Sequence, residues 1–272
     1  MNSTTNTQPK PWLGYLFVAY ALFCLGLSFG LEQWWPSQVA SPTLDVTVKQ
    51  TLPTTEIPVD IKQMKQDFFH LLLPSIIVEN QKIDKQRQHL LTLQRQHQAK
   101  TTSGDLTPQQ QALLHTLATQ YRVPSSMDDQ AVLSELLLRI DQVPASMVLA
   151  QAAVESAWGR SRFAKQANNY FGQWCFTKGC GLVPKRRNTG ASHEVARFDS
   201  LNHAVAAYLR NINSHSAYAD VRSRRAKNRR QQEPLNSLEM VGGLQKYSAR
   251  GEKYIDELRS VIEFNQLRNF DQ

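Results

Sequence analysis

The sequence lacks the residue patterns that hold metals and phosphorylated cofactors. It has three cysteines among 272 residues, and Cys175 and Cys180 have no two further ligands at zinc-binding spacing. The histidines form no HExxH pair, and no glycine-rich phosphate-binding loop is present. We therefore expect no metal and no cofactor.

The usual nucleophile motifs are absent as well. Ser156 does not lie in a G-x-S-x-G motif, and Cys175 lacks the sequence context of a catalytic thiol. These absences argue against serine or cysteine hydrolase chemistry.

Acidic residues are in the minority. The chain carries 31 Lys and Arg against 23 Asp and Glu, and residues 185–230 alone hold 11 basic and 3 acidic side chains. Such a segment favours acidic partners. Its run RSRRAKNRR could suit nucleic acid, but charge alone is a weak sign. No nucleic acid is expected if the body of the protein lies outside the cytoplasm.

Charge is missing altogether from residues 12–31, an apolar run of twenty residues. As a helix, this run spans the roughly 30 Å core of a bilayer. It is longer than the apolar part of a typical signal peptide, and Gln38 two residues before Ala40 makes a poor cleavage site. We expect a single-pass signal anchor in the inner membrane, with residues 1–11 in the cytoplasm and the body in the periplasm. The alternative is secretion after cleavage.

The remainder divides into three parts. Residues 32–60 are rich in Pro and Thr, which predicts an extended linker. Residues 61–130 show a helical pattern in which Pro74 predicts a break or a kink. This helical extension either belongs to the domain that follows or packs as a separate element. Residues 131–270 predict a mainly helical domain with a short β-hairpin after residue 173.

One carboxylate stands out in the helix predicted after Pro144. Glu155 shares a helix face with Val148 and Ala152, and this helix is apolar nearly all round. Burial there raises the pKa of a carboxyl group, which favours a general acid that keeps its proton near neutral pH. The alternative is a solvated surface residue. Trp158, one turn later, is either a wall for a sugar ring or a core aromatic.

Two motifs carry a family resemblance. The run AQAAVESAWGRSRFAKQANNYFG, residues 150–172, resembles the signature of bacterial peptidoglycan N-acetylglucosaminidases, glycoside hydrolase family 73. The run KYSARGEKYIDEL resembles the second family motif, although its Thr-Asp-Pro part is replaced here. Within the family the chain is most similar to the bacterial Bax-type proteins. The resemblance implies a lysozyme-like fold, mainly α with a small β-hairpin.

The resemblance also implies roles for individual residues. Glu155 matches the catalytic acid, and Tyr247 matches a tyrosine that lines the site. Glu194, on the predicted hairpin, is the candidate second carboxylate; otherwise the N-acetyl group of the substrate could assist. The other candidate substrate contacts share the first motif: Trp158, Asn169, Tyr170 and Phe171. Tyr170 and Phe171 either close a wall of the site or pack under the central helix.

The oxidising compartment expected for the body makes a disulfide between Cys175 and Cys180 reasonable, the alternative being two reduced thiols. The predicted activity is hydrolysis of the β-1,4 bond after N-acetylglucosamine in peptidoglycan glycan strands. The alternatives are a lytic transglycosylase or muramidase of the same fold, and a wall-binding protein without activity. The turn NNYFGQ differs from the Gly-Leu-Met-Gln-like turn that is usual in transglycosylases.

Overall fold

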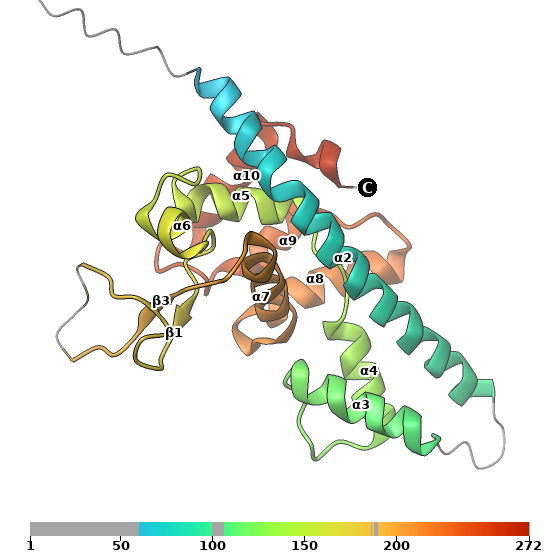
Figure 1. Ribbon diagram of the computed structural model, residues 1–272. Helices are drawn as coiled ribbons and strands as arrows, with labels where there is room; N and C mark the ends of the chain where they lie inside the picture. Colours follow the sequence, from blue (N-terminus) through green and yellow to red (C-terminus); the bar gives the residue numbers. More distant parts are fainter. Residues whose placement is uncertain (1–59, 100–105, 186, 188–189, 272) are drawn as a thin grey trace, which may run out of the picture. The chain divides into compact units, whose positions relative to one another are not determined.

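The computed structural model describes residues 60–99, 106–185, 187 and 190–271. The chain divides into two compact units, Met1–Glu56 and Ile57–Gln272. The described residues therefore all belong to the second unit, which is mainly helical and carries a small sheet (Figure 1).

The predicted membrane anchor lies outside the described residues, as does most of the predicted linker. Within the described ranges, none of the helices combines the length and the hydrophobicity that a bilayer crossing requires.

The first described helix is long. Helix α2, Ile61–Ala99, has 39 residues and continues through Pro74, so the predicted break does not occur. Pro74 is exposed, and the carbonyl group that its missing N–H leaves unpaired can be hydrated. The opposite face buries apolar side chains such as Leu72, Ile76 and Leu90. Helix α2 runs alongside α5 and α7 (Figure 1), so this segment shares the core of the domain.

Helices α3 (Pro108–Gln120) and α4 (Asp129–Arg139) each begin after a residue whose side chain caps the helix. Thr107 and Gln110 form a capping box in front of α3, and Asp128 caps α4 by accepting from the Ala131 N–H. These side chains satisfy backbone donors that the first helical turn leaves free.

The central helix, α5 (Ala145–Ser156), is buried over ten of its twelve residues. It contacts α2, α9, α10 and η3, which explains why its sequence is apolar nearly all round. Pro144 occupies the N-cap position. The helix ends three residues before Gly159, because Ala157 already adopts the left-handed conformation with φ of 50°.

After α5 and the short helix α6 (Arg162–Ala167), the chain forms the sheet. The sequence predicted a hairpin, whereas the structure has three antiparallel strands in the order β1-β3-β2. These strands are β1 (Trp174–Cys175), β2 (Gly181–Leu182) and β3 (Glu194–Ala196). The third strand pairs with both earlier ones, so it lies in the middle.

The last part of the chain is again helical. Helix α7 (Leu201–Ser214) is capped by Ser200, whose side chain accepts from the His203 N–H. The elements that follow are η1 (Ser216–Tyr218), α8 (Ala219–Gln231), α9 (Ser237–Met240), η2 (Val241–Leu244), α10 (Glu252–Phe264) and η3 (Leu267–Phe270).

Part of the basic segment is internal. Arg225 on α8 is 1% exposed and donates to the carbonyl oxygens of Leu138 and Arg139 at the end of α4. Asp141 accepts two hydrogen bonds from Arg229, at 2.8 and 3.0 Å. Burial by itself would raise the pKa of Asp141, but Arg229 and the neighbouring guanidinium groups lower it overall. The positive charge of residues 185–230 is therefore partly structural and does not all face a partner.

Close backbone packing of η2 against α8 gives a test of this arrangement. A Cβ atom on Gly243 would lie 2.4 Å from the backbone nitrogen of Val221. On Gly242 it would meet only the flexible ends of Arg224, at 3.0 Å, and Arg259, at 3.4 Å. We expect Gly243→Ala to lower the free energy of unfolding by about 1–3 kcal/mol, and Gly242→Ala to lower it by less. Urea denaturation of both variants measures this difference, and equal losses would contradict the packing described.

Candidate active site

Glu155 lies in the last turn of α5 and is partly buried. The next residue, Ser156, donates from its hydroxyl to the Ala152 carbonyl (2.6 Å) and accepts from the Gly159 N–H (2.8 Å). Ala157, Trp158 and Gly159 then have φ values of 50°, 59° and 75°. Three left-handed residues in a row turn the chain sharply, so the carboxylate stands where the buried helix ends.

The surroundings of Glu155 favour its protonated form. Burial raises the pKa of this carboxyl group, as the sequence predicted, and the nearby charge of Glu257 raises it further. A hydrogen bond from the Tyr254 hydroxyl and the charge of Arg250 oppose the rise without cancelling it. The group thus keeps its proton to higher pH than an exposed glutamate does.

The carboxylate is adjacent to an exposed stretch of backbone. Gly172 is exposed, with φ of 64°, and a Cβ atom at that position would lie 3.4 Å from Oε2 of Glu155. A glycine here keeps the backbone of the NNYFG turn close to the acid and leaves the space beside the carboxylate open.

Asn169 organises this turn. Its side chain is 1% exposed, and Nδ2 donates to the carbonyl oxygens of Gln173 (2.9 Å) and Ala196 (2.8 Å). Oδ1 accepts from the backbone N–H groups of Phe171 and Gln173. All of these bonds are internal, so Asn169 ties the turn to strand β3, and its assignment as a substrate contact stays a prediction.

The three aromatic candidates pack to different extents. Phe171 is 1% exposed and stacks on Tyr208 with ring centroids 4.2 Å apart, so it supports the site from the core. Trp158 packs edge-on against Phe68 and Phe69 of α2, and the Tyr170 ring lies 6.3 Å from Phe68. Both stay partly exposed, so either can combine packing with contact to a ligand.

Of the two tyrosines in the second motif, the structure brings Tyr254 to the acid. The Tyr247 hydroxyl donates to the Phe171 carbonyl (2.7 Å), and its ring stacks on that of Tyr254 with centroids 5.8 Å apart. The family resemblance implied a site role for Tyr247, and the sequence predicted no site residue in α10. The missed residues Tyr254 and Glu257 are three apart in α10, a spacing that places them on one helix face.

Glu194 has its carboxylate occupied within the sheet. Oε1 accepts from the Gly179 N–H (3.0 Å) and Oε2 accepts from the Gly181 N–H (2.8 Å). These two hydrogen bonds lower the pKa of Glu194. Such a carboxylate holds together the loop between β1 and β2, and its assignment as the second catalytic group stays a prediction.

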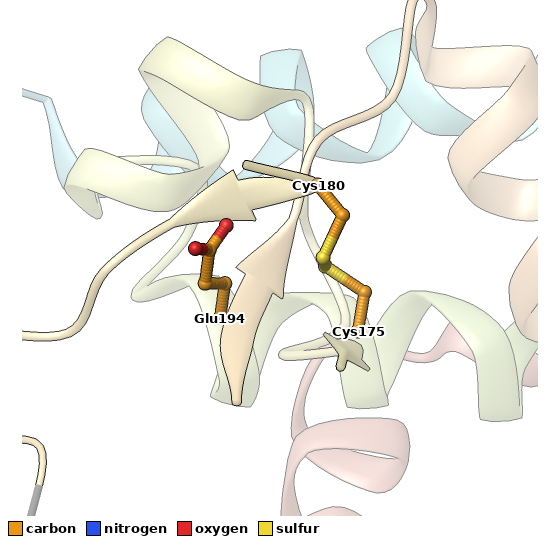
Figure 2. A group of neighbouring side chains, drawn as sticks. All are labelled: Cys175, Cys180 and Glu194. Atoms are coloured by element: carbon orange, nitrogen blue, oxygen red, sulfur yellow. A yellow bond between two sulfur atoms is a disulfide. The ribbon is translucent and has the colours of Figure 1, made fainter. Parts of the chain in front are cut away.

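The predicted disulfide is present beside this glutamate (Figure 2). Cys175 on β1 and Cys180 just before β2 are bonded, with their Cα atoms 6.2 Å apart. Sulfur and carboxylate atoms of Cys175, Cys180 and Glu194 lie within 4.8 Å of one another, a grouping that could hold a metal ion. Because the two sulfur atoms are bonded to each other, they are not thiolate ligands here.

Two cavities lie away from the residues around Glu155. One of about 500 Å³ is next to Pro144, at the opposite end of α5 from the acid. One of about 520 Å³ lies between α2, α4 and α8 and is lined by Arg87, Arg225 and Arg229. Glu155 lines neither of them.

Comparison with known proteins finds a family model whose match spans these residues. The model of the glucosaminidase family, described as mannosyl-glycoprotein endo-β-N-acetylglucosaminidase, matches residues 134–267. The protein bax of Escherichia coli K12 is 32% identical over 203 residues, which cover 74% of this chain and 70% of that protein. The catalytic domain of the autolysin Auto from Listeria monocytogenes is similar over 65% of this chain and 96% of its own, at 20% identity. Its TM-score of 0.37 is too low to support an argument. The family model and the bax relative show that the chain belongs to the glucosaminidase family, glycoside hydrolase family 73.

Proposed function

We propose that this protein, a glycosidase by family, hydrolyses the β-1,4 bond that follows N-acetylglucosamine in peptidoglycan. The observation that carries the proposal is the position of Glu155. It is a partly buried carboxyl group with a raised pKa, at the end of a buried helix and beside the exposed backbone of Gly172. A group of this kind can hold a proton near neutral pH and still reach a polymer at the surface.

The proposed reaction begins with proton transfer from Glu155 to the oxygen of the leaving sugar. The bond between that oxygen and the anomeric carbon breaks, and positive charge develops on the sugar ring. If a second carboxylate assists, it accepts the proton of the water that adds to the anomeric carbon. If the N-acetyl carbonyl of the substrate assists, its oxygen bonds to the anomeric carbon as the leaving oxygen departs, water then displaces it, and the proton of the water passes to the Glu155 carboxylate. The internal hydrogen bonds of Glu194 favour the N-acetyl group.

The proposed location is the periplasmic side of the inner membrane. The support comes from the uncharged run 12–31 and from the Cys175–Cys180 disulfide, a bond typical of oxidising compartments. Exposed basic residues such as Arg230 and Lys227 would attract the lactyl and peptide carboxylates of peptidoglycan.

The first test replaces the acid. We expect Glu155→Gln to lower the rate of peptidoglycan cleavage by about 10²–10⁴-fold, because an amide cannot protonate the leaving oxygen. Asp256→Asn, on the exposed side of α10, is the matched control and should retain activity. Mass spectrometry of the reduced fragments identifies the bond that is cleaved. Reducible N-acetylglucosamine ends support the proposal, whereas anhydro or muramic ends would assign the protein to a different reaction.

The same variant should be more stable than the parent protein. The usual pKa of Glu155 is 4.5, and burial raises it in the folded state. Above pH 4.5 the unfolded chain therefore ionises more readily, and stability falls as pH rises through the folded pKa. Glu155→Gln removes this penalty, so its melting temperature should exceed the parent's at pH 7. The two values should approach each other near about pH 4, and a variant less stable at pH 7 would contradict the burial argument.

Glu194 needs its own test, because a structural and a catalytic role predict different results. We expect Glu194→Gln to lower the melting temperature, since an amide can accept from only one of the Gly179 and Gly181 N–H groups at a time. The cleavage rate should fall by less than about tenfold. Glu263→Gln, on the exposed surface of α10, is the control. A much larger rate loss with an unchanged melting temperature would identify Glu194 as the assisting carboxylate.

A further inference from the structure

Gln151 is a buried polar residue that the proposed reaction does not use. It lies on α5, four residues before Glu155, which places it one turn earlier on the same helix face. Its side chain is 0% exposed in a helix that is otherwise almost entirely apolar. A buried amide of this kind is destabilising unless its hydrogen bonds are satisfied.

Both ends of the amide have partners on other helices. Oε1 accepts from the Tyr208 hydroxyl of α7, and Nε2 donates to the Tyr254 hydroxyl oxygen of α10 at 3.0 Å. Tyr208 and Tyr254 are also 0% exposed. The Tyr254 hydroxyl in turn lowers the pKa of the Glu155 carboxyl group through a hydrogen-bonding interaction. The four side chains therefore connect the core to the acid.

The direction of these hydrogen bonds decides which group accepts the proton of the Tyr254 hydroxyl. A tyrosine hydroxyl has one proton, and here the oxygen of Tyr254 already accepts from Gln151. The proton of Tyr254 is therefore available to Glu155. If the amide were reversed, its oxygen would face Tyr254 and compete with Glu155 for that proton.

Tyr208 disfavours the reversed amide. In that orientation Nε2 would face the Tyr208 oxygen, and the hydroxyl proton of Tyr208 would lose its acceptor inside the core. A buried donor without a partner is unfavourable. The Tyr208 ring is held independently by its stack on Phe171, so the position of the hydroxyl group that bonds Gln151 is fixed.

We propose that Gln151 is a positioning residue for the catalytic acid: fixed by Tyr208, its amide orients the Tyr254 hydroxyl so that this group donates to Glu155. The catalytic consequence rests on the proposed function, but the orientation itself does not. Gln151 contacts no substrate in this scheme and acts only through Tyr254.

The other titratable groups near Glu155 do not take the place of the Tyr254 hydroxyl that Gln151 orients. Arg250 and Glu257 carry opposite charges and pair with each other at 2.6 Å, so their influences on the acid are opposed. The remaining titratable neighbours are tyrosines whose pKa values burial raises further above their usual value, so they stay neutral near pH 7: Tyr208, Tyr218, Tyr247 and Tyr254.

The test measures the titration of Glu155 directly. The full chain, labelled with 13C at the glutamate carboxyl carbons and kept in mild detergent because of the predicted span, is titrated by NMR. Glu155→Gln identifies the signal. Tyr254→Phe removes a donor to the carboxylate and should raise the titration midpoint. Gln151→Met, similar in volume but unable to orient Tyr254, should raise it in the same direction.

The double variant separates positioning from packing. If Gln151 acts through Tyr254, then Gln151→Met added to Tyr254→Phe should cause no further rise in the midpoint. Tyr208→Phe keeps the ring stacked on Phe171 but frees the amide to reverse, so it should also raise the midpoint. Tyr208→Phe provides the test of the positioning role if Gln151→Met fails to fold.

In cleavage assays the high-pH limb of activity should move upward with the NMR midpoint, and the rate at the optimum should fall about tenfold. An unchanged midpoint in both Gln151→Met and Tyr208→Phe would overturn the proposal, whatever happens to stability. Midpoints that move as expected in a protein that cleaves no peptidoglycan would support the positioning role and refute the proposed function.

Discussion

The arrangement of the site depends on the partial burial of one carboxyl group. Glu155 loses hydration because α5 is enclosed by α2, α9 and α10, and this loss raises its pKa. The Tyr254 hydroxyl and the charge of Arg250 limit the rise. The helix that positions the acid therefore also tunes it, and substitutions in the core of α5 should affect chemistry as well as stability.

The elements around the acid are connected by buried polar side chains rather than by apolar packing alone. Asn169 ties the NNYFG turn to β3, Tyr247 bonds the carbonyl of Phe171, and Gln151 joins α7 to α10. Each of these bonds spans residues that are distant in the sequence. Buried networks of this kind define one arrangement, because any alternative leaves a polar group unsatisfied.

The basic segment shows that charge has two uses in this protein. Arg225 is fully enclosed and binds the carbonyl groups at the end of α4, while Arg230 on the same helix is exposed. A guanidinium group suits both roles, since its five donors can satisfy several carbonyl oxygens at once or meet an anion at the surface. Only the exposed share of the positive charge is available to a polymer such as peptidoglycan.

The sequence by itself determined the local features. Glu155 stood out because its helix is apolar on nearly every side. The caps Thr107, Asp128 and Ser200 are local too, because their side chains satisfy neighbouring backbone groups. The pairing of Cys175 with Cys180 was also within reach, because the two lie five residues apart. The tertiary structure decided everything that needs contacts between distant segments. It continued α2 through Pro74, placed β3 between two strands, engaged Glu194 with Gly179 and Gly181, and brought the Tyr254 hydroxyl to the acid. Spacing in a sequence gives the face of a helix on which a side chain lies, but only the packing of that helix against others decides what the side chain meets.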